Sequence, residues 1–231
     1  MSDLADLAFR SNEFSGRVRL FPLPNLVVFP HVMQPLHIFE PRYRAMFEEA
    51  VADDRLITMS LLAPGWEKNY EGRPAIEPIA CLGRVATYHR VGDDRYNLLL
   101  LGLRRVKIVR ELPPDKLFRE AEVEVWEDVY PNAGGSKRSA LLRELVRAFQ
   151  ALLPQAAESV EKLDQQSGNH LPLGMLTDIV AYTLQLDAPQ KYSLLSEPNV
   201  DRRAELLLSH LADTVKGSGR SEPFPPDFSA N

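Results

Sequence analysis

The residues that could act as metal ligands or thiol nucleophiles are scattered along this 231-residue sequence. Its five histidines never occur at the i, i+4 or paired spacing that brings two imidazoles to one metal ion. Cys81 is the single cysteine, so it cannot form an internal disulfide and offers too few thiolates for a metal site. These patterns predict no metal site and fit a reducing compartment.

Two glycine-containing stretches bear on nucleotide binding and on serine catalysis. No G-x-x-x-x-G-K-[S/T] sequence occurs, and the nearest run, "GGSKRS" at 134–139, has the composition of a linker. The run "GSGRS" at 217–221 lacks the strand and the helix that form a nucleophile elbow. A serine paired with a lysine or histidine through the fold stays open, although nothing local activates one. We therefore expect no catalytic residue and no cofactor.

A loop with large aromatic side chains is the better candidate for a binding site. Trp66, Tyr70 and Arg73 lie in residues 63–79, "APGWEKNYEGRPAIEPI", where three prolines and two glycines prevent the extension of either neighbouring strand. Large amphipathic side chains of this kind anchor many protein interfaces. The loop is either a lid packed on its own domain or a surface offered to a partner.

Three further candidate protein-binding residues, Phe39, Arg42 and Tyr43, flank the start of a predicted helix. Pro41 suits the first helical position, and apolar residues then recur at helical spacing for about three turns. For Arg42 the alternative role is an ion pair at the helix end or on the surface.

The first 128 residues otherwise have the pattern of a small β structure. Prolines interrupt the β-rich segments 17–21, 26–30 and 35–39, so these are expected to be short, bent strands. Longer strands are expected at the ranges 55–62, 81–91, 95–112 and 119–127, with a hairpin turn at 92–94 and a kink at Gly102. Together they predict a closed or nearly closed β subdomain that carries one helix.

The hydrophobic period changes from 2 to 3.6 at residues 130–137, which we interpret as a linker. Helices are expected from about 141 to a stop at Pro154, over 173–184, over 188–196 with Asp187 as its cap, and from an Asn199 cap to Gly217. The predicted organisation is therefore an N-terminal arm (1–16), a β subdomain (17–128), a helical subdomain (129–216) and a disordered tail (217–231).

The composition is that of a globular protein, with 45% hydrophobic residues, 26% charged residues and a net charge of −5. No run approaches the roughly 18 uncharged apolar residues of a membrane span, and the acidic start differs from a secretory signal. We expect a cytoplasmic protein without membrane contact. Neither half is basic, which disfavours nucleic acid as a partner.

Several stretches resemble the Lon protease N-terminal domain. "FPLPNLVVFPHVMQPLHIFEPRYRAMFEEAV" at 21–51 resembles its start, and "GRVATYHRVGDDRYNLLLLGLRRVKIVREL" at 83–112 resembles its glycine-centred strand pair. "LTDIVAYTLQLDAPQKYSLLSEPNVDRRAELLLSHL" at 176–211 is similar to its helical portion. "YEGRPAIEPIACLGRV" at 70–85 is similar to the version in stand-alone members, and the resemblance covers roughly 17–215.

This resemblance implies an α+β fold, a PUA-like β-barrel followed by an α-helical bundle. In full-length Lon proteases the domain recognises substrates and helps assembly, and an ATPase module and a Ser–Lys peptidase module follow it. Neither module is present in this sequence, so the family's catalytic residues have no positions to be carried onto. We therefore expect a protein that is not an enzyme.

The leading hypothesis is a non-catalytic module of protein quality control that binds unfolded or tagged polypeptides or a protein partner. An RNA-binding PUA-like module is one alternative, although no aromatic-basic motif supports it. An enzyme with an unrecognised cleft between barrel and bundle is another. Homo-oligomerisation, the identity of the client and any separate protease or chaperone stay open.

The absence of a P-loop yields a first prediction. The purified chain should neither hydrolyse ATP nor cleave casein, measured as phosphate release and as gel-resolved fragments. Turnover that survives repurification and disappears on mutation of a residue in this chain would contradict it.

Overall fold

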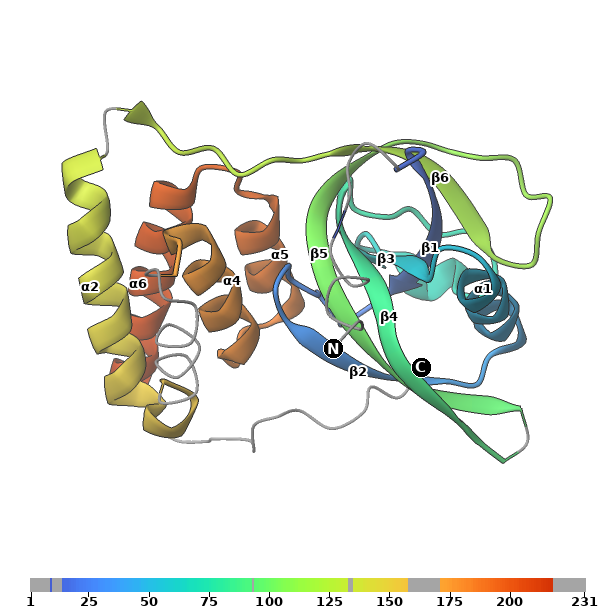
Figure 1. Cartoon of the computed structure of the whole chain (residues 1–231), viewed down its shortest axis with the longest axis horizontal. Coiled ribbons are helices and arrows are strands. Elements are labelled where there is room, and N and C mark those ends of the chain that lie inside the picture. Colours follow the sequence, from blue (N-terminus) through green and yellow to red (C-terminus); the bar gives the residue numbers. More distant parts are fainter. Residues whose placement is uncertain (1–8, 10–13, 93, 133–134, 158–170, 218–231) are drawn as a thin grey trace. The chain divides into compact units, whose positions relative to one another are not determined.

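The computed structural model describes residues 9, 14–92, 94–132, 135–157 and 171–217 (Figure 1). These residues form two compact units, which divide between Glu127 and Asp128. The first unit is built mainly of strands and the second of helices. The predicted arm and tail lie almost entirely outside the described residues.

The first unit contains six strands and one long helix. In chain order they are β1 (Arg17–Leu23), β2 (Met33–Ile38), α1 (Pro41–Ala52), β3 (Leu56–Leu61), β4 (Ile79–Val91), β5 (Arg95–Glu111) and β6 (Arg119–Val125). The sheet order is β2-β5-β4-β3-β1-β6, and β6 also pairs with β5. Five strands, β1, β3, β4, β5 and β6, therefore close into a barrel, and β2 extends the sheet along the first half of β5. The predicted α+β fold with a closed β subdomain is confirmed.

Alternating side chains fill the barrel with apolar groups. The buried cluster consists of Val18, Leu20, Leu56, Ala80, Leu82, Leu103, Val106, Ala121 and Val123. Because successive side chains of a strand point to opposite faces, a period of two selects this inward set. Burying one such aliphatic side chain contributes about 1.5–3 kcal/mol.

Helix α1 begins at Pro41, as predicted, and packs one face on the barrel unit. Its buried side chains are Tyr43, Met46, Phe47 and Ala50. The ring of Tyr43 lies 4.3 Å from that of Phe21 on β1, and Phe47 packs against the rings of Tyr88 and Tyr96. The helix is thereby fixed over β1, β4 and β5.

The strand predicted at 26–30 is wrong. Val27, Val28 and Phe29 are buried, but the segment is irregular and turns at Pro30 and His31. The residues that follow it bond to the middle of β5, where the His31 amide donates to the Gly102 carbonyl at 2.8 Å. The Gly102 amide donates to the Val32 carbonyl at 2.9 Å. The backbone therefore satisfies its polar groups by crossing β5 rather than by pairing as a strand.

Gly102 is required at this crossing because a side chain has no room there. A Cβ atom on Gly102 would lie 2.0 Å from the Phe29 carbonyl oxygen. The pairing of β4 with β5 also shifts register between Leu82 and Gly83, opposite this point. The predicted kink at Gly102 therefore coincides with a β-bulge and a backbone crossing.

The second unit consists of helices, whose described members are α2 (Gly135–Leu152), α4 (Leu173–Thr183), α5 (Ala188–Ser196) and α6 (Val200–Gly217). The predicted linker 130–137 is too long, since α2 already begins at Gly135. The predicted caps are confirmed. Asp187 and Gln190 form a capping box on α5, and the Asn199 carboxamide accepts from the amides of Asp201 and Arg202.

A buried arginine joins the start of the second unit to its last helix. The Arg203 side chain is 0% exposed, and its guanidinium donates to both carboxylate oxygens of Asp128 at 2.9 and 2.8 Å. It also donates to the Thr177 hydroxyl at 2.9 Å and to the Glu197 carbonyl at 3.0 Å. A buried charge is stable only when its partners satisfy it in this way.

The described residues contain neither a grouped set of metal ligands nor a helix suited to a membrane. Within those residues, no three side chains of His, Cys, Asp or Glu are grouped so that they could hold a metal ion. Among the helices that the structure describes, none is both long enough and apolar enough to cross a bilayer. Cys81 is buried and forms no disulfide.

The contact at Gly102 yields a second prediction. Gly102→Ala should lower the free energy of unfolding by at least about 2 kcal/mol, because a backbone oxygen cannot move aside for the new methyl group. Gly92→Ala is the matched control, since a Cβ there meets nothing within 4 Å. Urea unfolding of both variants measures the effect, and equal midpoints would contradict the proposed crossing.

Candidate functional site

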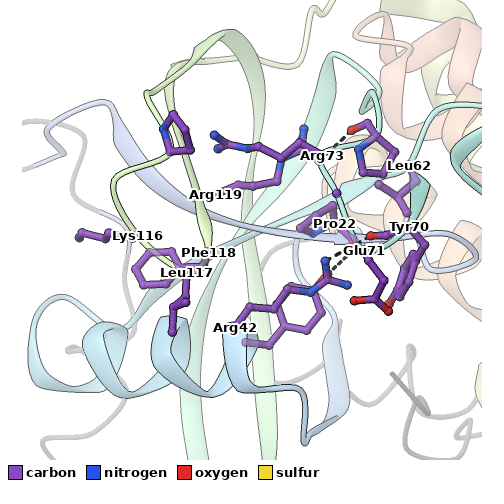
Figure 2. A pocket seen from close by; sticks show the side chains of 14 residues that line it. Pro22, Arg42, Leu62, Tyr70, Glu71, Arg73, Lys116, Leu117, Phe118 and Arg119 are labelled. Atoms are coloured by element: carbon purple, nitrogen blue, oxygen red, sulfur yellow. Dashed lines mark hydrogen bonds between the residues drawn. The ribbon is translucent and has the colours of Figure 1, made fainter.

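A pocket of about 160 Å³ opens in the first unit, where three segments meet (Figure 2). These segments are the 63–78 loop, the start of α1 and the 112–118 connection between β5 and β6. Its apolar lining comes from Pro22, Tyr43, Leu62, Leu117 and Phe118, and its charged lining from Arg42, Glu71, Arg73, Lys116 and Arg119. Apolar walls with a few charged groups are typical of ligand-binding pockets.

The pocket lies at one end of the barrel. Pro22 continues the inward row of β1 two residues beyond Leu20, and Arg119 on β6 pairs with Leu20. Leu62 follows β3 and forms an isolated bridge with Ile76, which brings the two ends of the 63–78 loop together. The loop therefore spans the mouth of the barrel.

Tyr70 fixes this loop to the start of α1. Its hydroxyl donates to Glu40 at 3.0 Å, and its carbonyl accepts from Arg42 at 3.3 Å. The Arg42 guanidinium also lies 4.9 Å from the centre of the Tyr70 ring and donates to Glu40 at 2.9 Å. Burial and the neighbouring Glu40 carboxylate raise the pKa of Tyr70, which keeps its hydroxyl protonated as a donor. Tyr70 is thus docked on its own domain.

Trp66 contacts Tyr70 but does not line the pocket. Residues Trp66–Asn69 form one turn of 3₁₀ helix inside the segment predicted as an irregular loop. Gly65 has a φ of 91° and permits the sharp turn before it. The half-buried Trp66 ring meets the Tyr70 ring edge-on at 5.7 Å, so it supports Tyr70 from outside.

The opposite end of the loop is held by Arg119. Its guanidinium donates to both oxygens of Glu111 at 2.8 and 2.5 Å and to the Pro74 carbonyl at 2.8 Å. Arg73 lies 3.7 Å from the same Glu111 carboxylate. One carboxylate at the end of β5 thus faces two guanidinium groups.

The third wall, 112–118, is tied to α1 by Lys116. Its ammonium group donates to Glu49 at 2.8 and 2.7 Å and to Glu120 at 3.2 Å. Glu49 also accepts from Arg19 on β1 at 2.9 Å. Ion pairs therefore join the helix, the barrel and the connection that carries Leu117.

The structure brings together four of the six residues that the sequence singled out. Arg42, Tyr43, Tyr70 and Arg73 line the pocket, whereas Trp66 and Phe39 do not. Burial raises the pKa of Tyr43, whose hydroxyl donates to the Pro22 carbonyl at 3.0 Å, so this residue forms a wall. The Phe39 side chain is exposed and its ring lies 5.8 Å from that of His37.

The wall formed by Lys116, Leu117, Phe118 and Arg119 was not predicted from the sequence. The only signal was a proline pair before two large apolar residues in "PPDKLF" at 113–118. A short connection has no period from which the direction of its side chains could be read.

Comparison with known proteins identifies the family. Residues 17–213 match the model of the ATP-dependent protease La (LON) substrate-binding domain. This chain belongs to the Lon substrate-binding domain family. Curated relatives include Lon protease 2 of Myxococcus xanthus, 26% identical over 198 residues, which are 83% of this chain and 23% of that protein.

A second relative, Lon protease 2 of Desulfotalea psychrophila, is 28% identical over 193 residues, covering 83% of this chain and 24% of that protein. This Lon substrate-binding domain chain therefore spans about a quarter of the length of the curated relatives that it matches.

Two solved structures share the fold of this Lon-family chain. The crystal structure of a Lon N-terminal domain protein from Xanthomonas campestris has a TM-score of 0.59 at 23% identity, covering 84% of this chain and 97% of that one. The N-terminal domain of the Mycobacterium avium complex Lon protease has a TM-score of 0.67 at 19% identity, covering 85% and 98%.

The ion pairs around Lys116 yield a third prediction. Burial raises the pKa of Glu49, but the hydrogen bonds from Lys116 and Arg19 outweigh it and hold that pKa below its ordinary value of 4.5. This stabilisation is present above the unfolded pKa and is lost as the pH falls through the lower, folded pKa. Glu49→Gln should therefore destabilise the chain at pH 7, by less than about 1 kcal/mol because the site is partly exposed.

Urea unfolding from pH 7 down to pH 3 measures this effect, and the difference between wild type and Glu49→Gln should shrink towards the acid end. The control is Glu67→Gln, which removes an exposed carboxylate that forms no ion pair within the described part of the chain. A difference that stays constant with pH would contradict the assignment.

Proposed function

We propose that this Lon-family chain binds segments of unfolded or tagged polypeptide, or a protein partner, in the pocket at the barrel mouth. The observation that carries the proposal is a pocket lined by apolar side chains and surrounded by charged ones. Unfolded polypeptides expose apolar side chains that such a pocket can shield from water. Membership of a family of substrate-binding domains supports the same function.

Leu117 is the residue best placed to contact a bound polypeptide. Its side chain is 74% exposed, whereas the adjacent Phe118 is 6% exposed and anchors the connection. Lys116 holds the same connection to α1 through Glu49. A large apolar side chain that also lines the pocket is thus exposed to solvent on a well-anchored segment, where a ligand can cover it.

We propose recognition rather than bond cleavage as the contribution of this chain. The matched family is defined by substrate binding, and the curated relatives extend well beyond the matched region. Two cations of the pocket form ion pairs with neighbouring carboxylates, Arg42 with Glu40 and Lys116 with Glu49. A surface of paired positive and negative side chains suits a polypeptide better than a phosphate backbone, which requires a concentrated positive face.

The exposure of Leu117 yields a fourth prediction. Leu117→Ala should weaken binding of a reduced, alkylated model protein by about fivefold, because about 1 kcal/mol of apolar burial is lost. Its melting temperature should stay at the wild-type value, since the side chain is already exposed. Fluorescence anisotropy with the labelled model protein measures the affinity.

Val109→Ala is the matched control, because Val109 is 53% exposed in the same unit but lies outside the pocket. It should bind as the wild type does. Equal binding by Leu117→Ala and wild type would exclude this wall from the site, and a wild-type chain that binds no unfolded protein would refute the proposed function.

A further inference from the structure

We propose that the pocket recognises the C-terminal residue of a bound polypeptide, with its apolar side chain inside and its α-carboxylate on Arg73. This inference rests on the proposed function and specifies which part of a polypeptide the site selects.

The size of the pocket limits its occupant to one residue. Its volume is about 160 Å³, and an apolar cavity of about 150 Å³ holds one benzene molecule. The apolar wall of Leu62 and Phe118 and the guanidinium of Arg73 line the same space. The space therefore fits an apolar group and an anion best when both belong to a single residue. In a polypeptide, only the C-terminal residue carries both a large apolar side chain and a carboxylate.

The charges of the pocket point to Arg73 as the group that binds the carboxylate. Arg119 uses three of its donors on Glu111 and Pro74. Arg73 has only the long 3.7 Å contact with Glu111, its side chain is 33% exposed, and it donates no hydrogen bond to any described residue. Two guanidinium groups thus share one carboxylate, which leaves a positive charge for an incoming anion. A guanidinium binds a carboxylate well because two parallel hydrogen bonds can form.

The other two cations of the pocket are already engaged. Arg42 pairs with Glu40 at 2.8 Å and donates to the Tyr70 carbonyl, although its buried Nη2 has no hydrogen-bond partner among the described residues. Lys116 donates to Glu49 and Glu120. Arg73 is therefore the cation of the lining that no short ion pair holds, so its charge is the one most open to a ligand.

Glu71 adds a negative charge to the lining that also contains Arg73. It is the single acidic residue of the lining and forms no ion pair with any residue that the structure describes. Because like charges repel, Glu71 should weaken the binding of a carboxylate at Arg73. Removing Glu71 and removing Arg73 should therefore have opposite effects on the same ligand.

Fluorescence anisotropy of N-terminally labelled ten-residue peptides, titrated with the full chain, tests this proposal. One Gly-Ser peptide ends in Phe with a free carboxylate, and a second ends in the same Phe as an amide. In a third, amidated peptide an internal Phe is followed by Asp. We expect the free acid to bind at least tenfold more tightly than either amidated peptide.

Variants of the chain assign the effect to the pocket. Arg73→Gln should remove the preference for the free acid without changing the melting temperature, and Glu71→Gln should strengthen binding of the free acid but not of the amide. Arg110→Gln, which removes an exposed guanidinium paired with Glu122 outside the pocket, should leave the preference unchanged.

The outcomes separate this inference from the proposed function. Equal affinity for acid and amide, with binding of the unfolded model protein retained, overturns the inference alone. Equal affinity for the free acid and the Phe-Asp peptide overturns recognition of a terminus. Failure to bind either the peptides or the unfolded protein overturns both proposals.

Discussion

The barrel unit depends on the sharing of strand β5 between two sets of partners. One edge of β5 pairs with β4 along most of its length, and the other edge pairs first with β2 and then with β6. The change of partner occurs near Gly102, which exchanges backbone hydrogen bonds with His31 and Val32. A main-chain oxygen occupies the space that any side chain would need, so closure of the barrel requires glycine at this point.

This constraint also positions the pocket. Because the second half of β5 pairs with β6, Glu111 at the end of β5 comes beside Arg119 at the start of β6. The same carboxylate then faces Arg73 from the 63–78 loop. The 112–118 connection is short and tied to α1, so Leu117 is presented at a fixed place. The chemistry of the site thus follows from strand pairing that is set far from its charged residues.

The sequence predicted what local physics determines. Pro41 as the first residue of α1, the cap at Asp187 and the period of the barrel strands depend on neighbours within a few residues. Where tertiary contacts decide, prediction failed. The 26–30 segment has strand composition but is irregular and leads into His31 and Val32, which bond to Gly102, and Leu117 lies in a connection without periodicity. Tyr70 was identified as an aromatic of interest, but its bond to Glu40, across 30 residues, could not be read from the sequence.

The Arg203–Asp128 pair has a consequence for the order in which the two units fold while a ribosome makes this protein. All strands of the barrel have been synthesised before Asp128, but the guanidinium that neutralises Asp128 follows 75 residues later. The Arg203 side chain, which the folded helical unit buries completely, is therefore the last part of this network to be synthesised. Since domains commonly fold as units in the order of synthesis, the nascent chain should carry a finished barrel while its helical unit still waits for residue 203.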